Sequence, residues 1–147
     1  MARKSITLTL QDRDQELTFK IKEMSAVQLE GWMCRALLLM AGSGIQVPNT
    51  ADIRAAGAYL AEKGLVALGN VDFEKAQPLL DELLGCCSRV VEKVQERCTP
   101  ATVDAYIQDV KTLFTLRMEA LKLNLGFSMP DIEKLSGYLG ARSTETE

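Results

Sequence analysis

Residues 5–41 read SITLTLQDRDQELTFKIKEMSAVQLEGWMCRALLLMA, and this stretch decides the fold. Apolar and polar residues alternate over residues 5–10 and again over residues 16–22, on either side of the polar segment 11–15. Strict alternation is typical of strands with one buried face, and a short polar turn between two such strands predicts an antiparallel hairpin. The sequence therefore predicts a β-hairpin over residues 5–22.

A helix start follows the hairpin. Ser25 is a natural N-cap, and Gln28 stands at the position that completes a capping box. Met24 and Leu29 are spaced to pack together as a hydrophobic staple. The helix that begins here contains the apolar run WMCRALLLMA at residues 32–41, and glycines at 42 and 44 end it.

Further helices are expected downstream. Residues 52–63 form a short helix with Asn49 or Thr50 as its cap, and residues 65–68 are either a short strand or a buried loop. A strong amphipathic stripe then predicts one helix from Pro78 through Cys98, made by Leu80, Leu83, Leu84, Cys87, Val91, Val94 and Cys98. The longest helix has its apolar face at Val103, Tyr106, Ile107, Val110, Leu113, Phe114, Met118 and Leu121. A final helix places Ile132, Leu135 and Leu139 on one side.

These elements predict an α+β fold, in which the N-terminal antiparallel β-hairpin is followed by four to five α-helices packed as a small helical domain. Residues 1–139 form the single domain, with helices from residue 25 onward, and residues 140–147 form a flexible tail. A lone two-stranded hairpin is marginally stable. Either the helices or the strands of another copy must therefore complete it, which leaves a homo-oligomer open.

Composition argues against several classes of function. The net charge of −3 and the aromatic content of 5% give no basis for binding nucleic acid, and no segment is long and apolar enough to cross a membrane. The chain contains no histidine, the commonest general base and zinc ligand. The pairs of neighbouring carboxylates fall on the polar faces of the predicted helices, where they interact with solvent and basic side chains rather than form a catalytic pair. We therefore expect no enzyme, no cofactor and no metal site, in a soluble intracellular protein.

The four cysteines have no metal-site spacing. They are expected to be small buried side chains of a protein in a reducing compartment, with the adjacent pair projecting from one helix; they are Cys34, Cys86, Cys87 and Cys98. A DNA-binding regulator remains an alternative, with residues 52–63 as its recognition helix. That segment is rich in alanine and nearly neutral, which disfavours groove readout.

The remaining signal is an excess of apolar residues on two helices. One interpretation is that both helices are core, since buried helices are apolar on all faces. The other is that part of this excess binds an apolar segment of another protein, with Trp32 as the anchor. The candidate partner-binding residues are then Trp32, Met33, Leu37, Met40, Leu116, Leu123 and Phe127.

Four segments, in the same order, resemble the tail assembly chaperones of tailed bacteriophages. They are ITLTLQDRDQELTFKIKEM, LEGWMCRALLLMAGSGIQVP, PLLDELLGC and TLFTLRMEALKLNLGF, and the resemblance spans residues 5–127. It implies a non-enzymatic protein, made late in infection in the host cell cytoplasm and absent from the mature virion. Such proteins bind the tape measure protein, keep its hydrophobic segments soluble and promote assembly of the tail tube, so the tail tube protein is a second implied partner. A structural component of the tail is the other alternative.

Overall fold

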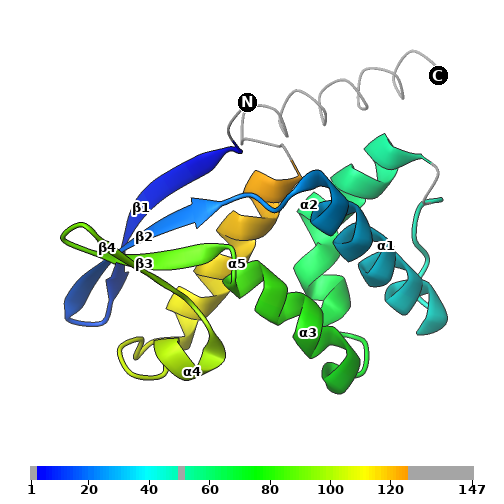
Figure 1. Cartoon of the computed structure of the whole chain (residues 1–147). Coiled ribbons are helices and arrows are strands. Elements are labelled where there is room, and N and C mark those ends of the chain that lie inside the picture. The colour runs from blue at the N-terminus through cyan, green and yellow to red at the C-terminus, as the bar shows by residue number, and fades with distance from the viewer. Residues whose placement is uncertain (1–2, 50–51, 126–147) are drawn as a thin grey trace, which may run out of the picture.

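The computed structural model describes residues 3–49 and 52–125. Over these residues it has four strands and five helices in a mixed α+β order (Figure 1). Their bounds are β1 Ser5–Asp12, β2 Gln15–Lys22, α1 Ala26–Gly42, α2 Ile53–Leu68, α3 Phe73–Leu84, β3 Cys87–Val91, β4 Val94–Arg97, α4 Pro100–Val103 and α5 Val110–Asn124. The α+β class is confirmed, but the N-terminal hairpin is only half of the sheet.

The sheet is antiparallel, with the strand order β1-β2-β3-β4. The predicted hairpin is confirmed, and its turn is reduced to Arg13 and Asp14, because Asp12 pairs with Gln15. The buried side of β2 carries the apolar residues of the alternation: Leu17, Phe19 and Ile21. One face of the sheet is therefore polar, and the other forms part of the core.

Helix α5 lies between the sheet and the group formed by α1, α2 and α3 (Figure 1). It packs against β1 and β2 on one side and against α2 and α3 on the other, while α1 packs against α2 and α3. Because α5 has two packed sides, it needs apolar residues around more than one face. This arrangement accounts for residues such as Leu116, which lies off the predicted stripe and is fully buried.

The predicted helix from Pro78 to Cys98 is wrong at both ends. Helix α3 begins earlier, at Phe73, so Pro78 lies inside the helix and not in its first turn. Helix α3 ends at Leu84, and β3 and β4 follow as a second hairpin. A spacing of four residues puts side chains on one face of a helix and also on one face of a strand, so Cys87 and Val91 fit both periods. The open edge of β2 decides the outcome, because its backbone groups need partners and β3 supplies them.

The predicted longest helix is also divided. Helix α4 ends at Val103, turns occupy the next residues, and α5 begins only at Val110. The Asp12 carboxylate, held at the end of β1, accepts hydrogen bonds from the backbone N–H groups of Gln108 and Asp109. Because these two N–H groups donate to Asp12, they cannot donate to the carbonyl groups of a helix that continues from α4. A new helix, α5, therefore begins after them.

Helix α2 is longer than predicted. Gly64 lies within it and residues 65–68 are its last turn, so neither a strand nor a loop forms there. A Cβ at Gly64 would lie 3.5 Å from Leu121 Cδ2, which shows how closely α5 approaches α2 at this point. Its N-cap is Asp52, whose side chain accepts from the Ala55 N–H, rather than Asn49 or Thr50.

The predicted start and end of α1 are confirmed. The Ser25 hydroxyl accepts a hydrogen bond from the Gln28 N–H at 3.2 Å, and α1 ends at Gly42. The Gln28 side chain contacts Glu82 on α3 at 3.4 Å rather than the cap backbone, so the reciprocal half of the capping box is replaced by a tertiary contact.

Two sequence predictions lie outside the described residues: the final helix around residues 132–139 and the tail at residues 140–147. Among the helices that the structure does describe, none combines the length and the apolar character that a membrane span requires.

Candidate functional site

Four of the seven candidate partner-binding residues lie in the core. Trp32, Leu37, Met40 and Leu116 have almost no exposed surface. The Trp32 indole N–H donates to the Leu79 carbonyl oxygen at 3.0 Å, which ties α1 to α3 from inside the molecule. A side chain without exposed surface offers no contact area to a partner in this conformation. For these four residues the structure supports the core interpretation of the apolar excess.

The other three candidates differ from one another. Met33 and Leu123 are half-buried against the core, and Phe127 lies outside the described residues. Met33 also lines an apolar groove beside α1, together with Leu37. The seven residues therefore do not form one continuous exposed surface in the described structure.

The exposed apolar surface is made by other residues. Among the described residues, the large hydrophobic side chains with the greatest exposure are Val27, Leu38, Val66, Phe73, Val91, Val94, Val110 and Phe114. Two of them are phenylalanines, Phe73 at 65% and Phe114 at 63% exposure. Exposed aromatic rings of this size, placed close together, are typical of interaction surfaces rather than of scattered surface residues.

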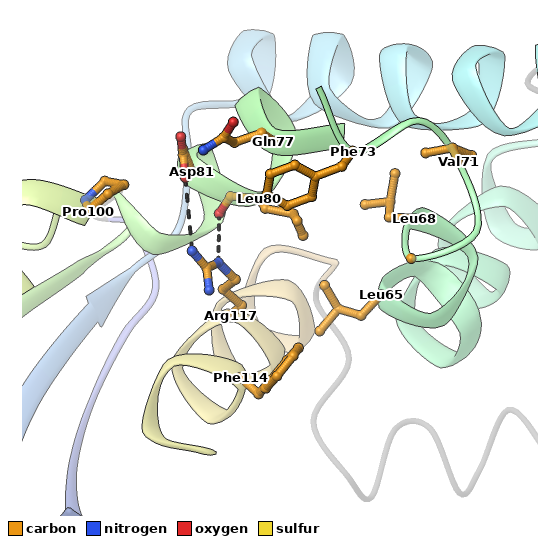
Figure 2. Close-up of a pocket in the computed structure, with 11 residues that line it drawn as sticks. Leu65, Leu68, Val71, Phe73, Gln77, Leu80, Asp81, Pro100, Phe114 and Arg117 are labelled. Atoms are coloured by element: carbon orange, nitrogen blue, oxygen red, sulfur yellow. Dashed lines mark hydrogen bonds and ion pairs between the residues drawn. The ribbon is translucent and has the colours of Figure 1, made fainter. Parts of the chain in front are cut away.

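The two phenylalanines flank one groove, which we call the α3–α5 groove (Figure 2). Figure 2 shows Phe73 and Phe114 on opposite sides of it, with Leu65 and Leu68 closing it from α2. Its volume is about 380 Å³. The residues that line it come from four helices and the connection between α2 and α3: Leu65, Leu68, Gly69, Val71, Phe73, Gln77, Leu80, Asp81, Pro100, Phe114 and Arg117.

Arg117 is the main charged group of the α3–α5 groove. Its Nε donates to the Leu80 carbonyl oxygen at 3.2 Å, and its Nη2 lies 3.9 Å from Asp81 Oδ1 (Figure 2). Burial lowers the pKa of the Arg117 guanidinium, and the Asp81 carboxylate offsets part of this effect. The guanidinium still carries its charge at neutral pH. The apolar lining thus has one fixed cation, partly neutralised by a carboxylate, along one side.

The cysteines are placed differently from the prediction. Cys86 lies in a turn and Cys87 begins β3, so the two do not project from one helix. Cys87 and Cys98 are buried as predicted, whereas Cys34 is exposed. Burial raises the pKa of the thiols of Cys86, Cys87 and Cys98, so these three stay protonated at neutral pH. The described part of the chain contains no group of three acidic or cysteine side chains able to hold a metal ion.

The sequence missed Phe73 and Phe114 for different reasons. Phe73 is the first residue of α3, ahead of the predicted stripe. The sequence places Phe114 on the buried face of the longest helix, but in the structure its side chain is exposed, because the sheet covers a different side of α5. Val110 and Phe114 are four residues apart and both exposed, so they lie on the same face of α5. This spacing indicates an exposed apolar face of α5 once the packed faces of the helix are known.

Comparisons with protein-family models, with curated proteins and with solved structures give no match for this chain.

Proposed function

We propose that this protein is a tail assembly chaperone of a tailed bacteriophage, which binds an apolar helical segment of the tape measure protein in the α3–α5 groove. The observation that carries the proposal is the pair of exposed phenylalanines that flank this groove. The resemblance of residues 5–127 to this family supplies the identity of the partner. On this proposal the protein acts in the host cell cytoplasm, without catalysis, and is absent from the mature virion.

The groove has the form that accepts an amphipathic helix. Phe73, Gln77 and Leu80 follow one another at three- and four-residue steps along α3. Phe114 and Arg117 do the same along α5. Two such rows with a trough between them present ridges into which the side chains of a third helix can fit. Long tape measure proteins are helical, so their apolar stripes match this geometry.

The energetic gain comes mainly from the aromatic rings. Burying a phenylalanine side chain that is now mostly exposed is worth about 1.5–3 kcal/mol, so the two rings contribute about 3–6 kcal/mol before ordering costs are subtracted. Micromolar affinity corresponds to about 8 kcal/mol, so the rest of the groove lining must supply the remainder of binding at that strength. Binding at this strength lowers the free concentration of an aggregation-prone partner by mass action while still allowing release during assembly.

The test is co-expression with the tape measure protein of the same phage, comparing the soluble fraction of that protein with and without the chaperone. The double variant Phe73→Glu, Phe114→Glu should abolish solubilisation and the complex on gel filtration, because it places charges on both sides of the groove. The matched control is Leu38→Glu, which alters another helical, large apolar residue at 66% exposure, on α1 and outside the groove.

Fluorescence of the buried Trp32 establishes that each variant is folded. Equal solubilisation by the groove variant and the wild type contradicts the groove as the binding site. No solubilisation and no complex with the wild-type protein contradicts the chaperone function itself. Recovery of the protein in stoichiometric amounts from purified virions would instead identify a structural component of the tail.

A further inference from the structure

Strand β1 forms one edge of the sheet and, in the described part of the chain, has a strand partner only on its β2 side (Figure 1). The Glu23 N–H donates to the Lys4 carbonyl oxygen at 3.0 Å, just ahead of β1, so the even-numbered residues of β1 direct their backbone groups to β2. Because the direction alternates along a strand, the odd-numbered residues direct their N–H and C=O groups to the open edge: Ser5, Thr7, Thr9 and Gln11.

This edge lacks the features that normally prevent a strand from pairing with another chain. Residues 5–11 contain no charged residue, no proline and no glycine. The register with β2 is unbroken over the whole of β1, so no bulge distorts the edge. The opposite edge of the sheet is β4, which is only four residues long and ends in Glu96 and Arg97. Of the two edges, β1 is therefore the one suited to strand addition.

The burial of the apolar face decreases from β2 to β1. Leu17, Phe19 and Ile21 of β2 are buried. The residues opposite them on β1 are only half-buried against the core, and they are Leu10, Leu8 and Ile6. The difference arises because β2 has a strand on each side and β1 has one on a single side. A strand added at the open edge would remove this remaining apolar surface from water.

We propose that β1 pairs antiparallel with β1 of a second copy of this chain, about a two-fold axis at Leu8, and joins two four-stranded sheets into one. With this register Thr7 lies opposite Thr9 of the second copy, and Ser5 lies opposite Gln11. All these pairs direct backbone groups toward each other, so they exchange about eight N–H···O bonds in total. The proposal is independent of the proposed function, because β1 does not line the α3–α5 groove.

The side chains favour a second copy as the occupant. Residues that lie opposite each other in an antiparallel pair share one face of the sheet, so Ile6 faces Leu10 of the second copy, and the two Leu8 side chains meet on the axis. Over residues 5–11 the polar face carries only hydroxyl and amide side chains, so no like charges meet there. A contact between two identical patches also closes on itself, and it leaves no β1 edge open in either copy.

The position of α5 is compatible with this pairing. α5 lies along the hairpin, because Thr112 near its start donates to Asp12 and Asn124 at its end accepts from the Met24 N–H. It packs on both β1 and β2, so the middle of α5 lies about one strand spacing, or 4.8 Å, from the proposed axis. The two α5 helices are then about 10 Å apart, an ordinary distance for packed helices, so they extend the interface without a clash.

The test is the mass of the protein in solution, measured by sedimentation over a dilution series. We expect the wild type to form a dimer of twice 16.2 kDa and to dissociate on dilution. The variant Thr7→Glu, Thr9→Lys places opposite charges across the proposed pairs and should still dimerise. Its matched control, Thr7→Glu, Thr9→Glu, places like charges there and should raise the dissociation constant about tenfold or more. Fluorescence of the buried Trp32 establishes that both variants are folded.

Disulfide trapping tests the register directly, in a Cys34→Ser background that removes the exposed thiol. Leu8→Cys should form a disulfide between two copies under mild oxidation, because Cα atoms of such a pair are about 4.5 Å apart, within disulfide range. Ile6→Cys, which is also half-buried but lies away from the axis, should not.

A wild type that stays monomeric at about 200 μM, where even weak dimers of μM affinity are populated, would overturn the proposal. Equal dimerisation of the two charge variants, without trapping at position 8, would overturn it in favour of another face of the molecule. A monomeric wild type that binds the tape measure protein, and loses this binding in Thr7→Glu, Thr9→Glu, would overturn it in favour of a strand from that partner.

Discussion

Asp12 holds the N-terminal hairpin to the start of α5, and replacing it by asparagine should destabilise the protein strongly. Its side chain has no exposed surface, and its two oxygens accept four hydrogen bonds. Oδ1 accepts from the Asp109 N–H at 2.9 Å and from the Thr112 hydroxyl at 2.8 Å. Oδ2 accepts from the Gln108 N–H at 2.9 Å and from Gln15 Nε2 at 2.7 Å.

Asparagine can replace only one of these two oxygens. With its NH₂ group at the Oδ2 position, asparagine would face two donors, the Gln108 N–H and Gln15 Nε2, and the Gln15 amide cannot turn over because Nε2 also donates to the Tyr106 carbonyl at 2.8 Å. With the NH₂ group at the Oδ1 position, the Thr112 hydroxyl can turn to accept from it, but the Asp109 N–H still faces a donor. At least one donor is therefore left without an acceptor in a buried site, which together with the lost charge should cost about 2–4 kcal/mol.

The pKa of Asp12 gives an independent measure of the same interactions. Burial raises the pKa of this carboxyl, but the hydrogen bonds from Gln108, Thr112, Asp109 and Gln15 outweigh it and lower the pKa from 3.8 to about 2. A folded-state pKa below the unfolded one means that the unfolded chain binds the proton more tightly. The contribution to stability, about 2 kcal/mol, is therefore fully present above pH 4 and is lost as the pH falls toward 2.

The assay is urea denaturation at 25 °C, followed by the fluorescence of the single tryptophan, which is buried. The comparison is between the wild type, Asp12→Asn and Asp14→Asn at pH 7 and at intervals down to pH 2. Asp14 is exposed in the same turn, so its variant should stay within about 0.5 kcal/mol of the wild type. Equal stability of the two variants at pH 7, or parallel losses of stability for all three proteins between pH 4 and 2, would refute the reasoning.

Three further predictions concern single contacts and use the same denaturation assay. Asn124→Ala removes the acceptor of the buried Met24 N–H and should cost about 1–3 kcal/mol; a loss below about 0.5 kcal/mol would contradict the contact. Glu82→Gln breaks the Arg35 ion pair at 2.7 Å, but because the arginine side chain is half-exposed the loss should stay below about 1 kcal/mol, and a larger one would show that the pair is more shielded than its geometry implies. Glu92→Gly should be neutral or stabilising by up to about 1 kcal/mol, because Glu92 has a φ of 57° in the β3–β4 turn, and clear destabilisation would show that its side chain matters more than its backbone strain.

The local signals in the sequence predicted those elements whose structure is decided by neighbouring residues. The alternation over residues 5–22, the Ser25 cap and the glycine-rich end of α1 all involve contacts within a few positions, and the structure confirms them. The capping box Thr99–Thr102, which begins α4 ahead of Val103, is equally local. For these elements, propensity and periodicity are sufficient because no distant partner competes.

The candidate site could not be predicted in the same way. Whether Phe114 is exposed depends on which side of α5 the sheet covers, and the sequence of α5 does not contain that information. The apolar run of α1 could be core or surface. Packing against the other helices buries Trp32, Leu37 and Met40, whereas Leu38 stays exposed. Exposed surface is what remains after all elements have packed, so it follows from tertiary structure alone.

The sequence by itself determined that the chain is α+β, begins with a hairpin, contains an excess of apolar residues and lacks histidine. Only the tertiary structure decided what residues 87–97 become. Their four-residue spacing suits a helix and a strand equally, and the unpaired edge of β2 makes the strand the more stable choice because it satisfies backbone groups on both sides. The same packing buried Trp32 and left Phe73 and Phe114 exposed, which moves the proposed binding surface from α1 to the groove between α3 and α5.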